Sequence, residues 1–148
     1  VVLGASVEAA ATLRPGIRAF VAAYEDAFNS HDPAALRAFY RDDADLIIRN
    51  GPVMHGRQAI RDWWQRYFSE PRPYRALFIP EDIRMVTADV ALVDLVATGA
   101  TAGATARPTS VRYARATWLL VREDERWLLA AVWVLPGEDD RILRAGGG

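Results

Sequence analysis

The order of two hydrophobic patterns constrains this chain more than any other feature of its sequence. Between Ile17 and Phe68, apolar residues recur at the three- and four-residue spacing of amphipathic helices, whereas residues 74–135 form successive segments rich in β-branched and aromatic residues. Helices that come first and strands that come last are typical of a domain whose helices pack on one face of an antiparallel sheet. We therefore predict an α+β fold.

Three helices are expected in the first half of the chain. The first covers residues 17–28, and the third covers residues 56–68. Between them, Asp32 is suited to cap a short helix with Pro33 in its first position, and this helix is expected to reach Tyr40.

A proline and a glycine near the N-terminus set the predicted domain boundary. Arg14-Pro15-Gly16 is expected to end any earlier helix. The sequence therefore predicts an N-terminal extension (1–16), a single domain (17–135) and a C-terminal tail (136–148).

Strands are expected from residue 46 onward. A brief strand at 46–48 precedes Asn50-Gly51, which is a strong tight-turn signal. The connection 99–110 is rich in Gly, Ala and Thr and is predicted to be a mobile flap. The longer strands are expected at residues 74–79, 83–87, 90–98, 111–122 and 126–135.

Composition excludes several kinds of chemistry. The chain has no Cys, and all 18 basic residues are Arg, so thiol nucleophiles, disulfides and lysine Schiff bases are excluded. No metal-binding or cofactor-binding motif is present, and we expect neither a metal nor a cofactor. The net charge of −1 favours neither nucleic acid nor membrane partners. No basic leader segment is seen, and a cytoplasmic location is expected.

Three ordered segments and a late strand pair resemble one family. The segments are YEDAFNSHD at 24–32, FYRDDA at 39–44 and HGRQAI at 55–60, and the strand pair carries Trp118 and Trp127. Together they resemble the nuclear-transport-factor-2-like superfamily, particularly its SnoaL-like and SgcJ-like bacterial branches. The resemblance implies a cone, in which a strongly curved antiparallel sheet wraps around three N-terminal helices and leaves a pocket at the open end.

The resemblance carries over only part of a known active site. Tyr24 matches the tyrosine that donates a hydrogen bond to the substrate oxygen in ketosteroid isomerase. The position of that enzyme's general base falls on Ile48, which cannot transfer a proton, and its protonated aspartate falls near Ala116. The resemblance therefore argues against isomerisation by that mechanism, although the superfamily also contains cyclases, dehydratases and non-catalytic binding domains.

Tyr24 and Asp94 are the candidate catalytic residues. Tyr24 lies among the inward apolar positions of the first helix, so it is either a phenol that donates to a ligand or a core tyrosine with a protein partner. Asp94 interrupts an otherwise apolar strand, and the superfamily alignment places it on the concave face. It is either a desolvated general acid or base, or half of a buried ion pair with Arg112 or Arg115.

Aromatic and small residues predict the pocket wall. Arg112 shares a strand face with Ala114, Ala116 and Trp118 if alternation is strict, which would leave space for an anionic or carbonyl-bearing aromatic ligand. The alternative is a surface or interface arginine. The predicted substrate-binding residues are Phe20, Phe28, Ile48, Trp64, Phe68, Arg112, Trp118 and Trp133.

Two functions remain open at this point. One is a cofactor-independent enzyme of bacterial secondary metabolism that acts on a polyketide-like or enediyne-like intermediate. The other is a protein of the same fold that binds a small apolar or aromatic ligand without chemistry. We also expect a homodimer through the outer face of the sheet, because the strands are apolar on both faces.

Overall fold

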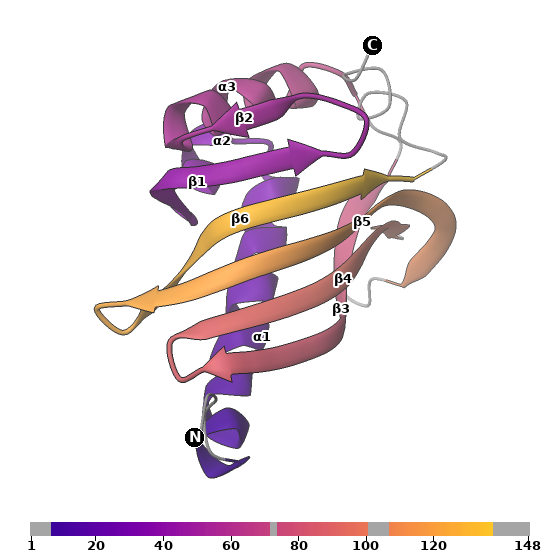
Figure 1. Ribbon diagram of the computed structural model, residues 1–148. Helices are drawn as coiled ribbons and strands as arrows, with labels where there is room; N and C mark the ends of the chain where they lie inside the picture. Colours follow the sequence, from indigo (N-terminus) through magenta and orange to yellow (C-terminus); the bar gives the residue numbers. More distant parts are fainter. Residues whose placement is uncertain (1–6, 72–73, 101–106, 138–148) are drawn as a thin grey trace.

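One long helix lies across one face of a curved sheet (Figure 1). The computed structural model describes residues 7–71, 74–100 and 107–137, and the side chains from residue 14 onward. Within these residues there are three helices and a six-stranded sheet. The α+β fold predicted from the sequence is thereby confirmed.

The helices are α1 (Val7–Asn29), α2 (Pro33–Arg37) and α3 (Arg57–Phe68). The side chain of Asp32 accepts a hydrogen bond from the backbone of Ala34, so the predicted cap of α2 is present. Helix α1 continues through Pro15, contrary to the expected end at 14–16. A proline removes one backbone donor, but the rest of the helix still packs on the sheet.

The strands are β1 (Tyr40–Ile48), β2 (Val53–His55), β3 (Arg75–Thr87), β4 (Val90–Ala100), β5 (Pro108–Glu123) and β6 (Arg126–Pro136). They lie in the order β2-β1-β6-β5-β4-β3, and only β1 and β6 run parallel in this described sheet. Tyr40 therefore opens a strand instead of ending a helix. The predicted flap at 99–110 lies partly outside the described residues, and its ends belong to β4 and β5.

The inner face of the sheet carries the core. Ile17, Val21, Tyr24 and Phe28 recur along α1 at helical spacing and are all buried. They belong to the same core cluster as Trp118, which contacts Tyr24 and is among the largest fully buried side chains. The edge strand β3 is attached to α1 by side chains of the helix. Their hydrogen bonds take the place of those that a neighbouring strand would supply.

Glu25 and Asn29 make this attachment. The Asn29 side chain donates to the carbonyl of Ala76 and accepts from its N–H, both at 2.8 Å. Glu25 accepts from the N–H of Phe78 at 2.7 Å. These bonds satisfy backbone groups that an edge strand otherwise exposes. Glu25 is therefore a structural residue that fixes the edge strand.

Two bulges change which side chains face inward. At Tyr113, β5 has one residue more than β4, because Ala97 pairs with Ala114 and Thr98 pairs with Arg112. At Ala130, β6 has one residue more than β5. A bulge interrupts strict alternation, so residues on its two sides change face relative to a regular strand.

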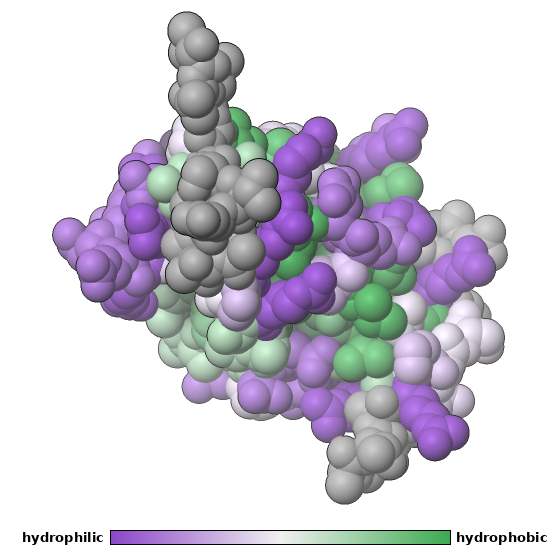
Figure 2. Space-filling model, turned by 90° about the horizontal axis from the view of Figure 1, so that it is seen from below, coloured by the Kyte–Doolittle hydropathy of each residue, from purple (hydrophilic) through white to green (hydrophobic). Residues whose placement is uncertain are grey.

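The surface seen from below is mixed. Hydrophobic residues show between hydrophilic ones and do not form one continuous field in this view (Figure 2). Scattered apolar residues of this kind are ordinary for a folded domain.

A substitution at Gly137 tests whether the chain approaches the bulge in β5 as closely as the structure shows. The N–H of Gly137 donates to the carbonyl of Tyr113 at 2.7 Å, and an added Cβ would clash with the backbone carbonyl oxygen of Arg112. Because that contact is with backbone, we expect Gly137→Ala to lower the free energy of unfolding by about 1–3 kcal/mol.

Gly16→Ala is the matched control. A Cβ at Gly16 meets Trp127 at 3.6 Å, which is ordinary contact, and alanine favours the helix by about 0.5–1 kcal/mol. Urea unfolding of both variants measures the difference. Equal effects in the two variants would contradict the close approach at Gly137.

Candidate ligand-binding chamber

The sheet has a hollow on each face. The inner hollow, called here the chamber, has a volume of about 40 Å³. Such a volume holds on the order of three water molecules. The chamber is lined by Tyr24, Phe28, Trp64, Tyr67, Ala76, Phe78, Leu95, Ala97, Tyr113, Ala114, Ala116, Trp118, Val132 and Val134.

Two hydrogen bonds connect Tyr24 and Trp64, which line the chamber, through Tyr40, which is not part of the lining. The hydroxyl oxygens of Tyr24 and Tyr40 lie 2.7 Å apart, and Trp64 Nε1 donates to the Tyr40 hydroxyl at 3.2 Å. The three side chains come from α1, β1 and α3. All are buried, with Tyr24 at 3 % exposure and Tyr40 at 0 %.

Helix α3 is held against β1 so that Trp64 reaches Tyr40. The Arg57 Nε donates to the carbonyl of Tyr40 at 2.9 Å, and Arg57 also pairs with Asp42 at 3.1 Å. Gly56 donates to the carbonyl of Ala44 at 2.7 Å. Gly56 has a φ of 89°, a conformation that glycine adopts without strain.

Burial keeps both phenols neutral. It raises the pKa of Tyr40 to about 12, although hydrogen bonds from Tyr24 and Trp64 partly oppose this shift. Burial also raises the pKa of Tyr24 well above its usual 10.0, and the neighbouring Tyr40 adds to the effect. Near neutral pH the two residues are therefore hydrogen-bond donors and do not act as bases.

One donor proton of the Tyr24, Tyr40 and Trp64 side chains is not used by the two hydrogen bonds between them. Two hydroxyl groups and one indole N–H supply three protons, and the two hydrogen bonds use two of them. The remaining hydroxyl proton has no acceptor among the described residues, whichever tyrosine carries it. The hydroxyl of Tyr113 is already committed to the carbonyl of Tyr74 at 2.9 Å.

The chamber wall holds no carboxylate, imidazole or guanidinium among the described residues. The polar side-chain groups of its lining are phenols and the indoles of Trp64 and Trp118. This arrangement can bind an acceptor oxygen, but it offers no general base of ordinary strength.

Four predicted site residues lie in this wall. Tyr24, Phe28, Trp64 and Trp118 line the chamber, and the ring centroids of Tyr24 and Trp118 are 4.7 Å apart. Three other predicted residues support it from behind. Phe20 packs edge-on against Trp118, Phe68 stacks on Trp64, and Ile48 is buried in the core.

The predicted position of Asp94 on the concave face is wrong. Val93 and Leu95 are buried in the core, and the intervening Asp94 lines the outer hollow, where its carboxylate accepts from Thr117 at 2.7 Å. Alternation did place Leu92, Asp94 and Val96 on one face, but that face is the outer one. Arg115, one of the two expected ion-pair partners of Asp94, pairs instead with Glu81.

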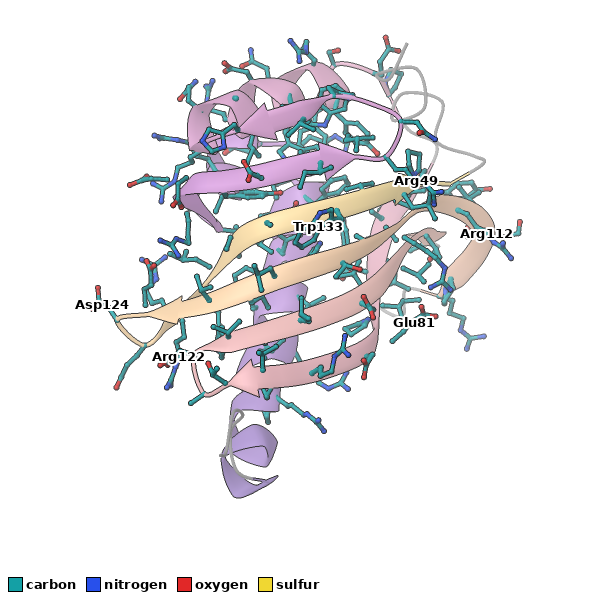
Figure 3. The ribbon with its side chains drawn as sticks, in the orientation of Figure 1. Arg49, Glu81, Arg112, Arg122, Asp124 and Trp133 are labelled. Carbon is teal, nitrogen blue, oxygen red and sulfur yellow. The ribbon has the colours of Figure 1, made fainter. Side chains whose placement is uncertain are left out.

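Arg112 and Trp133 also lie outside the chamber. The bulge at Tyr113 leaves Arg112 exposed and Tyr113 buried, and Figure 3 shows the Arg112 side chain pointing away from the sheet. Trp133 is 42 % exposed on the outer face, because the bulge at Ala130 puts Val132 and Val134 inward. The prediction that these two residues line the inner pocket is therefore wrong.

Sequence reasoning missed Tyr40, Tyr67, Phe78 and Tyr113. Tyr40 was assigned to the end of a helix, where its hydroxyl had no evident role. Regular alternation from Tyr40 through Asp42 to Ala44 does not describe this strand, because the pairing of β1 with β6 shifts register between Tyr40 and Asp45. Phe78 was recognised as part of a strand, but its face was not assigned.

Comparison with known proteins identifies the family. The profile of the SnoaL-like domain matches residues 17–132. The chain belongs to the SnoaL-like domain family. The SnoaL-like resemblance that the sequence motifs indicated is thereby confirmed. No curated protein sequence matches significantly.

Solved structures share this SnoaL-like fold. A scytalone-dehydratase-like protein from Novosphingobium aromaticivorans has a TM-score of 0.74 at 16 % identity, with 89 % of each chain covered. A ketosteroid-isomerase-like protein from Erwinia carotovora atroseptica has a TM-score of 0.62 at 23 % identity, covering 81 % of this chain and 92 % of that one. A domain of unknown function with a cystatin-like fold from Nostoc punctiforme has a TM-score of 0.68 at 22 % identity. The match covers 84 % of this chain and 76 % of that one.

At these identities the neighbours of this SnoaL-like domain establish the fold alone. In the part of the chain that the structure describes, no cluster of His, Asp and Glu side chains is arranged to hold a metal ion. No described helix has both the length and the apolar character needed to cross a membrane.

The raised tyrosine pKa values predict a loss of stability in alkali. A pKa that is higher in the folded state favours the protonated form there, so its stabilisation is complete below the unfolded value of about 10 and is lost as pH rises through about 12 for Tyr40. Between about pH 9 and about pH 11, the unfolding free energy should fall by about 1–3 kcal/mol more than in the Tyr24→Phe/Tyr40→Phe variant. Urea unfolding across this range measures the difference, and parallel curves would contradict the burial of the phenols.

Proposed function

We propose that this protein binds a small, mostly apolar molecule that presents a carbonyl or similar acceptor oxygen to the chamber. The observation that carries the proposal is the uncommitted hydroxyl proton of the Tyr24–Tyr40 pair. A buried donor without an acceptor costs about 1–3 kcal/mol, and a ligand oxygen removes that cost. The aromatic wall supplies the rest of the contact surface.

The chamber volume limits what can enter. Ligand pockets usually have volumes of about 300–1,000 Å³. The chamber is much smaller, with a volume of about 40 Å³. A ring-sized ligand therefore requires one side chain to move. Phe78 is suited to this movement because it is only half-buried, lies on the edge strand β3 and contacts Tyr24 edge-on at 5.5 Å.

Catalysis on a polyketide-like or enediyne-like intermediate is the second candidate. The uncommitted hydroxyl proton of the Tyr24–Tyr40 pair also favours this candidate, because two linked phenols can stabilise negative charge that develops on a substrate oxygen. Against it stands the outward position of Asp94, which leaves the chamber without a residue to move a second proton. The binding function therefore fits the geometry better.

Two probes of nearly equal shape test the binding proposal. Acetophenone carries a ketone oxygen, and α-methylstyrene replaces that oxygen with a CH₂ group. We expect acetophenone to bind about fivefold more tightly, which corresponds to about 1 kcal/mol for one hydrogen bond. Titrations followed by NMR would give both dissociation constants.

Variants separate the hydroxyl groups from the wall. Phe78→Ala should strengthen the binding of both probes, since it opens the chamber. Adding Tyr24→Phe and Tyr40→Phe together should abolish the preference for the ketone and leave α-methylstyrene unchanged. The double change is required because either phenol alone keeps a hydroxyl proton. Failure of both probes to bind to Phe78→Ala, or an unchanged preference in the triple variant, would contradict the proposal.

Hydrogen exchange distinguishes the two candidates. An enzyme that stabilises an enolate should accelerate exchange of the acetophenone methyl protons in deuterated water. Binding alone predicts exchange no faster than with the Tyr24→Phe/Tyr40→Phe variant. A clear acceleration by the native protein would favour catalysis.

A further inference from the structure

One side of the chamber is formed by the edge strand β3, and a helix closes the free edge of this strand. Ala76 and Phe78 of β3 line the chamber. Both pair with β4 on one side, whereas the described sheet has no strand on the other side. Side chains of α1 take that place: Asn29 holds Ala76 by two hydrogen bonds. Glu25 holds Phe78 by one, so the chamber wall is attached to α1 at two neighbouring points.

The bond to Glu25 acts on the residue that must move to admit a ring-sized ligand. The Glu25 carboxylate oxygen lies 2.7 Å from the backbone nitrogen of Phe78, and both side chains are half-buried. A carboxylate is a stronger hydrogen-bond acceptor than a neutral oxygen. The backbone of Phe78 is therefore held toward α1 by a strong single bond, separate from the two bonds at Ala76.

The ring of Phe78 is surrounded by other rings. Its centroid lies 5.1 Å from that of Phe28, 5.5 Å from that of Tyr24 and 6.1 Å from that of Trp118. These rings belong to α1 and β5. Because closely packed side chains leave little room for rotation, the ring clears the chamber when its backbone moves away from α1.

The backbone around Phe78 lies between two fixed points. Asn29 holds Ala76 on one side. On the other side, Glu81 is an extra residue of β3, since the pairing with β4 shifts between Pro80 and Asp82, and Glu81 pairs with Arg115 at 2.6 Å. Such a bulge bends a strand, and β3 is visibly curved (Figure 1). Residues 77–80 can therefore bow away from α1 while both ends stay in place.

We propose that Glu25 is a positioning residue of the chamber, whose bond to Phe78 holds residues 77–80 against α1 and keeps the chamber closed until a ligand enters. The proposal rests on the ligand-binding function proposed above. Entry of a ring-sized ligand then breaks this hydrogen bond. The native protein therefore binds more weakly than an already open chamber would. Glu25 selects ligands whose contacts inside the chamber outweigh that loss.

A double-mutant cycle with Phe78→Ala tests the positioning role. Glu25→Ala removes the acceptor, so acetophenone should bind at least about fivefold more tightly, the factor that corresponds to one hydrogen bond. In Phe78→Ala no ring has to move. Adding Glu25→Ala to that variant should therefore change the affinity by less than about twofold. Titrations followed by NMR give all four dissociation constants.

Two further variants are controls. Glu25→Gln keeps an acceptor oxygen at the same place and should retain most of the native behaviour. Asp26→Ala removes a charge from the neighbouring position of α1, where the side chain is exposed and has no hydrogen bond or ion pair among the described residues. It should leave the affinity unchanged. Urea unfolding of each variant checks that it is folded.

The outcomes separate this proposal from the ligand-binding function. Acetophenone that binds Phe78→Ala, together with weaker or unchanged binding in Glu25→Ala, would overturn the positioning role alone. An equal gain from Glu25→Ala in both backgrounds would overturn it as well. If acetophenone does not bind even Phe78→Ala, the ligand-binding function fails and the positioning role fails with it.

Amide hydrogen exchange of the native protein gives a readout that needs no substitution. Saturating acetophenone should speed the exchange of the Phe78 N–H, because that group loses its acceptor when the chamber opens. The Ala76 N–H, which Asn29 holds, should keep its protection and is the internal control. Slower or unchanged exchange at Phe78 under saturating acetophenone would contradict the opening of this bond.

Discussion

The hydrogen-bond chain from Trp64 through Tyr40 to Tyr24 joins the three parts of this fold. One residue comes from each of α3, β1 and α1, and all three are buried among aromatic rings. Since buried polar groups must be paired, the chain fixes how closely the two helices and the strand approach. The same constraint leaves one hydroxyl proton over, so the element that orders the core also supplies the polar feature of the chamber.

The two faces of the sheet carry different side chains, and alternation together with the bulges in β5 and β6 decides which residues of these strands lie on each face. Among the described residues, the chamber on the inner face is lined by aromatic and small apolar residues and by no ionised group. The outer face receives Arg49, Asp82, Asp94 and the exposed Trp133. Asp94 therefore lies on the outer face, away from the chamber, where its carboxylate accepts a hydrogen bond from Thr117. Its unusual place in an apolar strand is explained by an uncovered face.

The fold class could be predicted from the sequence because helical and strand periodicities are separate along the chain. The positions of Tyr24, Phe28, Trp64 and Trp118 followed from the same patterns and the family motifs. The face of Asp94 could not be predicted, because Val93 and Leu95 are as apolar as Leu92 and Val96. Arg112 and Trp133 were misplaced because bulges at Tyr113 and Ala130 depend on strand pairing, which local sequence does not encode.

The most direct test of the account is a crystal structure of the protein soaked in acetophenone. The account predicts that the ketone oxygen lies within about 3 Å of the Tyr24 or Tyr40 hydroxyl, the usual length of such a hydrogen bond. The ring of the ketone should occupy space vacated by Phe78. A ketone bound only elsewhere on the protein, with the chamber unchanged at saturating concentration, would contradict the claim that this chamber is the functional site.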